Sequence, residues 1–481
     1  MTDDGLGVGV MYTPALEPFL EARPDLAPVL ELEPETLWTE TGTAEFIVDR
    51  EALERVRRLP QRKLVHGVGF PVGGTRLPDR RHIEPLRETI EILESPWASE
   101  HLGFNEAELE GRRLFPGFLL PPRQTLAGVE AAAETIGAVA ADLPVPFAVE
   151  TGVSYLRPRR DELSDGAFVA AVAGRADCGI LLDLHNLWVN ERNGRQPVDE
   201  FLAELPLDRV WEMHVAGGLE LDGFYLDAHS GEIPRELLAL AASVVPRLTN
   251  LRAIVYELTP ETVPRLGLAG VEEQLELLQE LWEVHDAQPS ARPTELSSQP
   301  VLVDDPGPTP REWEDELGRQ VAGFPPTGAF GEELARDPGV AMLRRLAEEV
   351  RAGMVTDCLP LTSRLLLLTL GRERFRQLLE RYWRSSSPAL FGITEADGFA
   401  RFLAQEQPQI PFLTEVLGYE HALLRARRER ARSTVRFRHD PAELLSALAA
   451  GEMPDLPEID EFLVVVDAST ATEEAHAPVW A

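Results

Sequence analysis

Residues 178–190, CGILLDLHNLWVN, join a hydrophobic run to a group of polar side chains. The run that begins at Cys178 predicts a buried strand, and this strand ends in Asp183, His185 and Asn186. Burying a carboxyl group and an imidazole costs free energy unless other groups pair with them. The polar end of the strand therefore indicates a site whose other members must be sought elsewhere in the chain.

Similar hydrophobic runs recur through the first part of the chain, and amphipathic segments such as 82–94 and 125–143 lie between them with apolar residues at helical spacing. Eight strands with interposed helices over about 280 residues predict an α/β fold of the (β/α)8 type, a TIM barrel. A doubly wound open sheet is the main alternative, but no glycine-rich turn follows the first strand. The predicted strands are 6–12, 28–33, 63–69, 97–101, 145–150, 178–184, 209–215 and 252–258.

The pattern changes after the barrel region. We expect a barrel domain over residues 1–286, a linker rich in proline over 287–327, and a mainly helical domain with a small β element over 328–481. The two β-like runs of the last domain are 433–439 and 461–467.

Composition narrows the function classes. A net charge of −35 argues against general binding of nucleic acid, which requires Lys and Arg to neutralise phosphates. No apolar run approaches the roughly 20 residues that span a bilayer, and the acidic start MTDDGLGVGV does not resemble a secretory signal. We expect a cytoplasmic protein that does not bind membranes. Cys178 and Cys358, the only cysteines, do not suggest a disulfide framework, and we expect Cys178 to be structural.

Polar residues collect at the C-terminal ends of the predicted strands, where barrels of this type hold their active sites. Three acid-x-His pairs stand out, and on a strand two residues so spaced point the same way. A single histidine or glutamate of this kind is more often a structural, hydrogen-bonded residue than a ligand. The residues at or near these strand ends are Glu31, Glu33, His66, Glu100, His101, Glu150, Asp183, His185, Asn186, Glu212, His214, Asp227, His229 and Glu257.

Together, these imidazoles and carboxylates favour a metal site over coincidence. So many acidic groups at one barrel mouth would repel each other unless positive charge lies among them, and a mixed His/carboxylate set suits iron, manganese or zinc. The potential ligands exceed the needs of one ion, so we predict a cluster of two or three, bridged by carboxylates such as Glu150 and Glu257.

The ordered motifs LVHGVG, ASEHLGF, PFAVETGVSYL, CGILLDLHNLWVN, WEMHVAG and DAHSG resemble those of the multinuclear non-heme iron-dependent oxidative enzymes. The resemblance covers most of residues 6–260. It implies a TIM barrel that holds two or three irons of mixed Fe(II)/Fe(III) state and uses dioxygen to modify a residue, often cysteine, in a ribosomally made precursor peptide. The ligands that it implies are His66, His101, Glu150, Asp183, His214, Asp227, His229 and Glu257, with Asn186 matching the asparagine of an Asp-x-x-Asn motif.

Two positions depart from the family pattern. Many members have Asn where this chain has His185, and Glu-Asn where it has Glu150 and Thr151. We include His185 and Asn186 among the expected ligands, which makes ten. These departures bear on the third metal position, and the sequence identifies no residue as catalytic beyond the metal ligands.

The C-terminal domain resembles the partner proteins encoded beside these enzymes, through LLLLTLGRERFRQLLERYWRSSSPALFGI and FLAQEQPQIPFLTEVLGYEHALLRA. The resemblance implies that a fused domain replaces the separate partner and recognises the precursor peptide. Phe375, Tyr382 and Trp383 are candidates for a peptide-binding surface, with packing in a helical core as the default interpretation.

Two other functions remain open on the sequence. One is a non-redox isomerase or hydrolase that uses manganese or zinc on the same barrel, since fold does not fix function. The other is a non-catalytic scaffold that binds metal through the barrel and a partner through the C-terminal domain.

Overall fold

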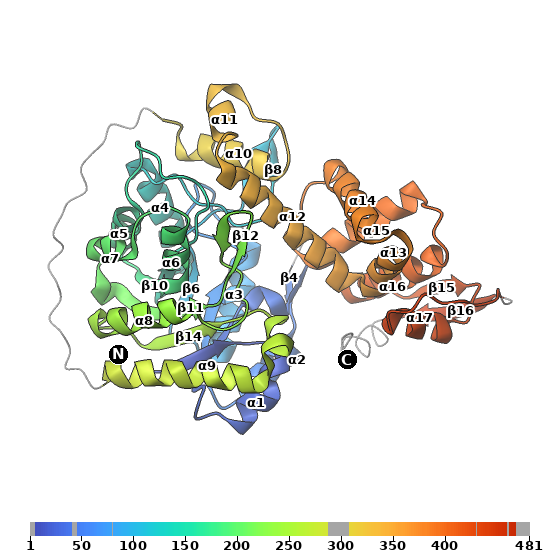
Figure 1. Ribbon diagram of the computed structural model, residues 1–481, viewed down its shortest axis with the longest axis horizontal. Helices are drawn as coiled ribbons and strands as arrows, with labels where there is room; N and C mark the ends of the chain where they lie inside the picture. Colours follow the sequence, from blue (N-terminus) through green and yellow to red (C-terminus); the bar gives the residue numbers. More distant parts are fainter. Residues whose placement is uncertain are drawn as a thin grey trace.

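The computed structural model describes residues 5–40, 46–78, 80–286, 307–429, 431–458 and 461–467. Its first part is a closed barrel of eight parallel strands in the order β1-β14-β11-β10-β9-β6-β5-β2 (Figure 1). Each strand overlaps one of the eight predicted runs, so the predicted barrel is confirmed. The barrel strands are β1 (Gly7–Met11), β2 (Val29–Leu32), β5 (Arg62–Gly67), β6 (Ala98–His101), β9 (Phe147–Glu150), β10 (Gly179–Asp183), β11 (Val210–Ala216) and β14 (Ala253–Glu257).

The barrel strands are almost continuously apolar because both of their faces are covered. Every residue of β2, β10 and β14 is buried, as expected for a parallel sheet with helices on one face and packed side chains on the other. The helices around the barrel are α1 (Glu17–Ala22), α2 (Arg50–Arg58), α3 (Arg80–Leu93), α4 (Leu126–Asp142), α5 (Asp165–Ala176), α6 (Leu184–Arg192), α7 (Val198–Glu204), α8 (Arg235–Val244) and α9 (Thr262–Asp286).

Three β-hairpins enlarge the connections that follow barrel strands, so they lie at the end of the barrel that carries the polar strand ends. One follows β2, another follows β6 and the third follows β11. Their strands are β3 (Trp38–Glu40) with β4 (Phe46–Val48), β7 (Ala107–Leu109) with β8 (Arg112–Leu114), and β12 (Leu219–Leu221) with β13 (Phe224–Leu226).

Helices α10 (Pro310–Val321), α11 (Gly328–Leu334) and α12 (Pro338–Cys358) begin the part of the chain that follows the barrel (Figure 1). They pack on the connections at the barrel mouth and share a core with Leu120 and Tyr155. Trp313 of α10 is 2% exposed, and its indole N–H donates to the Pro121 carbonyl at 3.0 Å. We call α10, α11 and the first half of α12 the cap.

The linker expected over residues 287–327 does not extend through the whole of that range. Helix α10 lies inside that range and begins with a capping box between Thr309 and Glu312. Proline is well tolerated at the first helical position, so Pro310 starts this helix instead of preventing it. Residues 287–306 lie outside the part of the chain that the structure describes.

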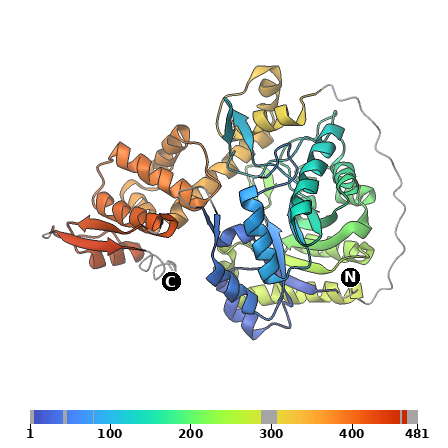
Figure 2. The same cartoon turned by 180° about the vertical axis from the view of Figure 1, so that it is seen from behind.

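The rest of the chain forms a helical region with its own core, as predicted, and α12 connects it to the cap (Figure 2). Apolar residues recur at helical spacing over 361–383, but this stretch forms two helices, because Gly371 has φ +75° and ends the first. The elements are α13 (Pro360–Leu370), α14 (Arg372–Ser385), α15 (Gly392–Glu406), α16 (Leu413–Glu429), β15 (Ser433–Phe437), α17 (Pro441–Ala449) and β16 (Phe462–Val466). Strands β15 and β16 pair antiparallel and form the small β element.

Within the described ranges, no single helix is long and apolar enough to cross a bilayer. One pair, α12 and α13, reaches that length and hydropathy only when taken together, and the two helices are bent by 110° at their junction.

The packing of the cap predicts the effect of Trp313→Ala. Removing this buried indole leaves a cavity and an unpaired Pro121 carbonyl, so the variant loses about 3–5 kcal/mol of stability. Amide hydrogen exchange in residues 118–120 rises, whereas exchange in β15 and β16 does not; Pro121 and Pro122 have no amide hydrogen. Leu367→Ala is the control, because this side chain on α13 is 41% exposed. Unchanged exchange in 118–120 would contradict the proposed role of Trp313 in holding this connection.

Candidate metal centre

The polar strand ends converge at the barrel mouth. His66 lies near the end of β5 and His214 near the end of β11, whereas four other residues are the last of their strands: His101, Glu150, Asp183 and Glu257. Asp227 and His229 come from the connection after β13, and His185 and Asn186 from the first turn of α6. The barrel therefore brings all ten sequence-predicted ligands to one end.

The first group is His66, His101 and Glu150. The Nε2 atoms of His66 and His101 lie 3.2 and 3.0 Å from the same oxygen, Glu150 Oε2. Two ligand atoms that each lie about 2.1 Å from one ion, at right angles to each other, are about 3.0 Å apart. The two distances therefore match the separation of neighbouring ligand atoms around one ion. These three side chains offer one metal position.

Glu150 also belongs to a second group, with Asp183, His214 and Glu257. His214 Nδ1 lies 3.2 Å from Glu257 Oε2 and 4.0 Å from Glu150 Oε1. The two carboxylate oxygens of Glu150 thus face different groups, which is the arrangement that a bridging carboxylate requires. This geometry suits two adjacent ions.

His185, Asp227 and His229 meet at a single atom. Asp227 Oδ1 lies 3.0 Å from His185 Nδ1 and 2.9 Å from His229 Nε2, which also lies 3.4 Å from Glu257 Oε2. His229 has φ +45°, an uncommon conformation for a residue other than glycine. Its carbonyl accepts hydrogen bonds from the Thr259 N–H and the Thr262 hydroxyl, each at 3.1 Å, which hold the loop in place.

A third close group lies deeper in the barrel. Glu31 of β2 and Glu212 of β11 are fully buried on the far side of His214, and Glu31 Oε2 lies 2.8 Å from His214 Nε2. The Trp97 indole N–H donates to Glu212 Oε2 at 2.8 Å. One nitrogen of His214 therefore faces the second group, while the other has a carboxylate that orients the ring, as is usual for histidine ligands.

Other side chains orient the ligands of the mouth. The Ser99 hydroxyl lies 3.0 Å from His66 Nδ1, which leaves Nε2 directed at Glu150. The Thr151 hydroxyl accepts from the Asp183 N–H at 2.9 Å, so Thr151 supports the strand end without being a ligand itself. Asp183 Oδ1 caps helix α6 by accepting from the Asn186 N–H at 2.8 Å, which leaves Oδ2 for another partner.

The residues present fit a metal cluster, because many of their buried polar atoms form no hydrogen bond of suitable geometry with the described residues, although several lie only 2.8–3.4 Å from one another. Such atoms are rare in proteins and costly unless an ion satisfies them. They are both oxygens of Glu31, both ring nitrogens of His214, His66 Nε2, Glu150 Oε2, Asp183 Oδ2, His185 Nε2, Asn186 Oδ1, Glu212 Oε1, His229 Nε2 and Glu257 Oε2.

Four imidazoles of the mouth have raised pKa values because carboxylates surround them. Burial acts to lower the pKa of His66 and His101, but Glu150, together with Glu31 at His66 and Glu100 at His101, outweighs burial and raises both. The pKa values of His214 and His229 are raised in the same way by neighbouring carboxylates, with burial again opposing the shift.

The carboxyl groups divide into two kinds. Burial acts to raise the pKa of Glu150, but the imidazoles of His101 and His66 hold it well below its ordinary value. Burial and the nearby Asp227 and Glu150 raise the pKa of Asp183 well above its usual range. Without a cation, protons take up the excess negative charge at Asp183.

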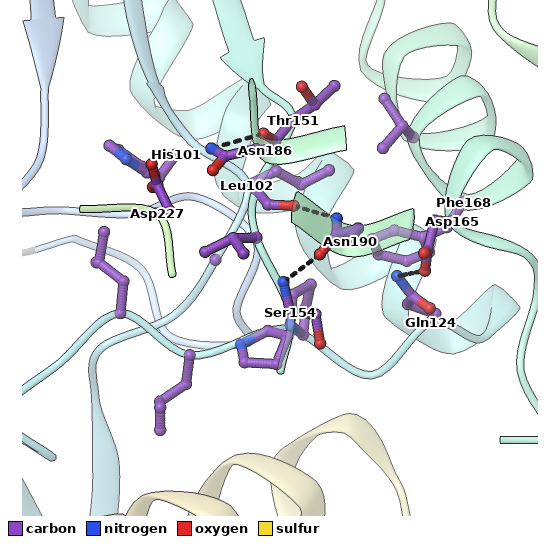
Figure 3. A pocket seen from close by; sticks show the side chains of 18 of the residues that line it. His101, Leu102, Gln124, Thr151, Ser154, Asp165, Phe168, Asn186, Asn190 and Asp227 are labelled. Carbon is purple, nitrogen blue, oxygen red and sulfur yellow. Dashed lines mark hydrogen bonds between the residues drawn. The ribbon is translucent and has the colours of Figure 1, made fainter. Parts of the chain in front are cut away.

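A cavity of about 110 Å³ opens beside the cluster. His101, Asn186 and Asp227 lie at its inner end, as Figure 3 shows, and Gln124 and Asp165 lie on the opposite wall. The connection 118–122 and apolar side chains form most of the remaining wall. The volume suits one side chain, and the apolar wall keeps bulk water away from the inner end.

Sequence reasoning did not single out the orienting groups. Ser99 stands two residues before His101 on one strand, so the same strand periodicity that revealed the acid-x-His pairs contained a signal for it. Trp97, the first residue of the predicted strand 97–101, shares this periodicity, but an indole on a strand is usually an ordinary core residue and does not by itself indicate a polar contact. The connection 118–122, which forms part of the cavity wall, contains no residue type that would have marked it as part of a site.

Comparison with known families identifies the first part of the chain. The family described as RiPP precursor modification enzyme MbnB/TglH/ChrH, which acts on ribosomally synthesised and post-translationally modified peptides, matches residues 5–286. The chain belongs to this family. The match covers the whole barrel and all ten predicted ligands, and it ends before the cap.

Named relatives are UPF0276 proteins. The chain is 32% identical over 233 residues to one from Streptomyces avermitilis, which covers 47% of this chain and 48% of the relative. It is 30% identical over 227 residues to one from Chromobacterium violaceum, which covers 47% of this chain and 81% of the relative. The chain therefore spans about half the length of the Streptomyces relative and most of the Chromobacterium one.

Similar solved structures include a xylose isomerase domain protein from Planctomyces limnophilus, with a TM-score of 0.39 and 13% identity over 59% of this chain and 99% of that one. A D-psicose 3-epimerase solved in the presence of D-fructose has a TM-score of 0.38 and 11% identity, over 58% of this chain and 99% of that one.

The first group predicts a graded loss of metal. Ser99→Ala lowers metal affinity by roughly 10–100-fold, because the ring of His66 loses its orienting partner. His66→Ala lowers it further, because a ligand is removed. His421→Ala is the control, since this residue pairs with Asp397 in the helical region. Elemental analysis and competition with a chelator measure the effect, and equal metal content in all three variants would contradict the assignment.

The raised pKa values of the four histidines predict that metal binding releases protons. Each of these imidazoles binds a proton more tightly than an ordinary histidine, and a metal must displace that proton. Affinity therefore rises as the pH rises through the range where the imidazoles titrate. Calorimetric titration in buffers of different ionisation enthalpy measures the protons released, and binding independent of the buffer and of pH would contradict this prediction.

Proposed function

We propose that this protein is an iron- and dioxygen-dependent enzyme that oxidatively modifies a residue, often cysteine in the family, of a ribosomally synthesised precursor peptide. The observation that carries the proposal is the position of Glu150, whose two carboxylate oxygens face two adjacent sets of ligands. Family membership supports the peptide substrate.

The ligand set favours iron over a structural ion. Imidazole and carboxylate groups together suit iron, manganese and zinc, and no thiolate takes part because Cys178 and Cys358 lie outside the cluster. His66, His101, Glu150, Asp183, His214 and Glu257 would hold two ions, and His185, Asn186, Asp227 and His229 surround the place for a third. Iron held there would supply the electron transfer with dioxygen that side chains cannot perform.

The protein itself provides binding, orientation and exclusion of water. The cavity beside His101 and Asp227 accepts one side chain of the peptide, and its apolar wall at Phe118 and Phe168 displaces solvent. Asp227 Oδ1 lies at hydrogen-bond distance, 3.0 Å, from His185 Nδ1, which leaves His185 Nε2 free to face another group. The Asn186 amide donates to the Thr151 carbonyl at 3.3 Å, so its unpaired oxygen has a fixed direction at the inner end of the cavity.

The cap and the helical region are proposed to recognise the peptide in place of a separate partner protein. Of the three aromatic residues considered for this role, Phe375 and Tyr382 are buried in the helical core. Trp383 lines a cavity next to the cap, and we therefore propose this residue as the aromatic contact of the peptide.

Metal identity tests the proposed function. Protein purified without oxygen is expected to contain two or three irons per chain, magnetically coupled in the Mössbauer spectrum, with less iron in His66→Ala. Exposure to dioxygen is expected to change the spectrum of the wild type. Stoichiometric zinc or manganese, with no iron even when iron is supplied, would instead indicate the non-redox isomerase or hydrolase.

A further inference from the structure

His185 and Asn186 follow one another at the start of α6, but their side chains point in different directions. Successive residues of an α-helix are about 100° apart around its axis. Asn186 and Asp227 line the cavity beside the metal ligands, as Figure 3 shows. His185 is fully buried and is not among the described residues that line this cavity. Its ring lies instead near those of Trp188 and Tyr225, with ring centroids 6.1 and 6.3 Å away.

The Nδ1 atom of His185 is the hydrogen-bond donor to Asp227. It lies 3.0 Å from Asp227 Oδ1, and an ionised carboxylate can only accept, so the ring hydrogen is on Nδ1. His229 Nε2 lies 2.9 Å from the same oxygen but forms no hydrogen bond of suitable geometry with any described residue. His185 therefore holds the carboxylate, and His229 Nε2 is left for an ion beside it.

The other ring nitrogen of His185, Nε2, lies against the hairpin β12–β13. A Cβ added to Gly218, directly before β12, would lie 2.9 Å from His185 Nε2 and 2.5 Å from Tyr225 Cε1, in contact with the Leu226 carbonyl. The hairpin therefore occupies the space next to Nε2. Among the described residues, the three groups of potential ligand atoms that lie within 4.8 Å of one another do not include His185.

The burial of His185 does not require an ion at Nε2. This nitrogen has no hydrogen-bond partner among the described residues. Because the ring hydrogen is on Nδ1, Nε2 carries only a lone pair, and an unsatisfied acceptor is tolerated more often than an unsatisfied N–H. The hydrogen bond to Asp227 is therefore sufficient to explain why an imidazole is buried at this position.

We propose that His185 is a positioning residue and not a metal ligand: its Nδ1–H holds Asp227 in the orientation in which Asp227 and His229 share an ion. Asn186, Asp227 and His229 would then be the protein's ligands at this place. Three protein ligands leave coordination positions open, as in catalytic sites, and the cavity lies beside Asn186 and Asp227. The inference rests on the metal centre of the proposed function, but not on iron, dioxygen or a peptide.

Three substitutions of His185 separate the roles of its two ring nitrogens. In asparagine the amide nitrogen is bonded to Cγ, as Nδ1 is in histidine, so His185→Asn keeps a donor near the place of Nδ1. In glutamine the amide nitrogen is one bond further from the backbone, so His185→Gln keeps a polar group only near the place of Nε2. His185→Ala keeps neither.

Binding of Co²⁺ to the full-length, metal-free protein measures the effect, through competition with a chelator and elemental analysis of the ions bound per chain. Co²⁺ binds to the same nitrogen and oxygen ligands as Fe²⁺, and more tightly. The affinity for one bound ion is expected to fall roughly 10–100-fold in His185→Ala and His185→Gln, because Asp227 loses its orienting partner. In His185→Asn the affinity falls by less than about tenfold, because the donor is retained.

Two further variants locate the effect. His439→Ala is the matched control and leaves Co²⁺ binding unchanged, because His439 Nδ1 lies 2.9 Å from Glu415 Oε1 in the helical region. In an Asp227→Ala background, His185→Ala is expected to cost no further affinity, because His185 acts through Asp227. Thermal melting checks that each variant is folded.

Several results would overturn the inference: His185→Asn as weak as His185→Ala, His185→Gln as strong as His185→Asn, a loss of the same size in His439→Ala, an undiminished loss in the Asp227→Ala background, or unchanged binding in every variant. If the variants show the expected pattern with Co²⁺ but the wild type takes up no iron, only the proposed function fails. If the wild type holds iron but His185→Asn is as weak as His185→Ala, only this inference fails. A wild type that binds no Co²⁺ would overturn both.

Discussion

Closure of the parallel barrel is the constraint on which the rest of the structure depends. A closed parallel sheet directs the carboxyl ends of all eight strands to one rim, so residues distant in sequence must meet there. Glu150 lies between two groups of ligands on this rim: one of its oxygens faces His66 and His101, and the other faces His214. Its burial is acceptable only because opposite charge surrounds it, whether from protonated imidazoles or from metal.

Much of the fold and part of the site followed from sequence periodicity. Eight apolar runs of strand length, separated by helical patterns, were enough to predict the barrel, and strand alternation placed Glu212 beside His214. The close groups around Glu150 depend on strand register, which no single run contains: His101 pairs with Glu150 only because β6 and β9 align at those residues. The start of α10 was also missed, because Pro310 reads as a linker residue unless the capping box around it is recognised.

The cap packs against the connection that lines the cavity beside the metal ligands. Trp313 holds Pro121, and the connection from 118 to 122 forms the wall of the cavity beside the ligands. The cap therefore supports one wall of this cavity without contributing a ligand. The two arginines that flank Trp313, Arg123 at 5.4 Å and Arg159 at 5.8 Å from its ring, add cation–π contacts between barrel and cap.

The family match ends at residue 286, whereas the cap, which packs on the connection 118–122, begins at Pro310 on the same chain. Docking of the cap is consequently an intramolecular event, governed by an effective concentration on the order of millimolar, set by the length of the connection. Packing of the cap on the barrel therefore does not depend on the protein concentration, and dilution does not separate the two. A separate subunit in the same place would dissociate at low concentration, and the metal centre would then be open to solvent for part of the time.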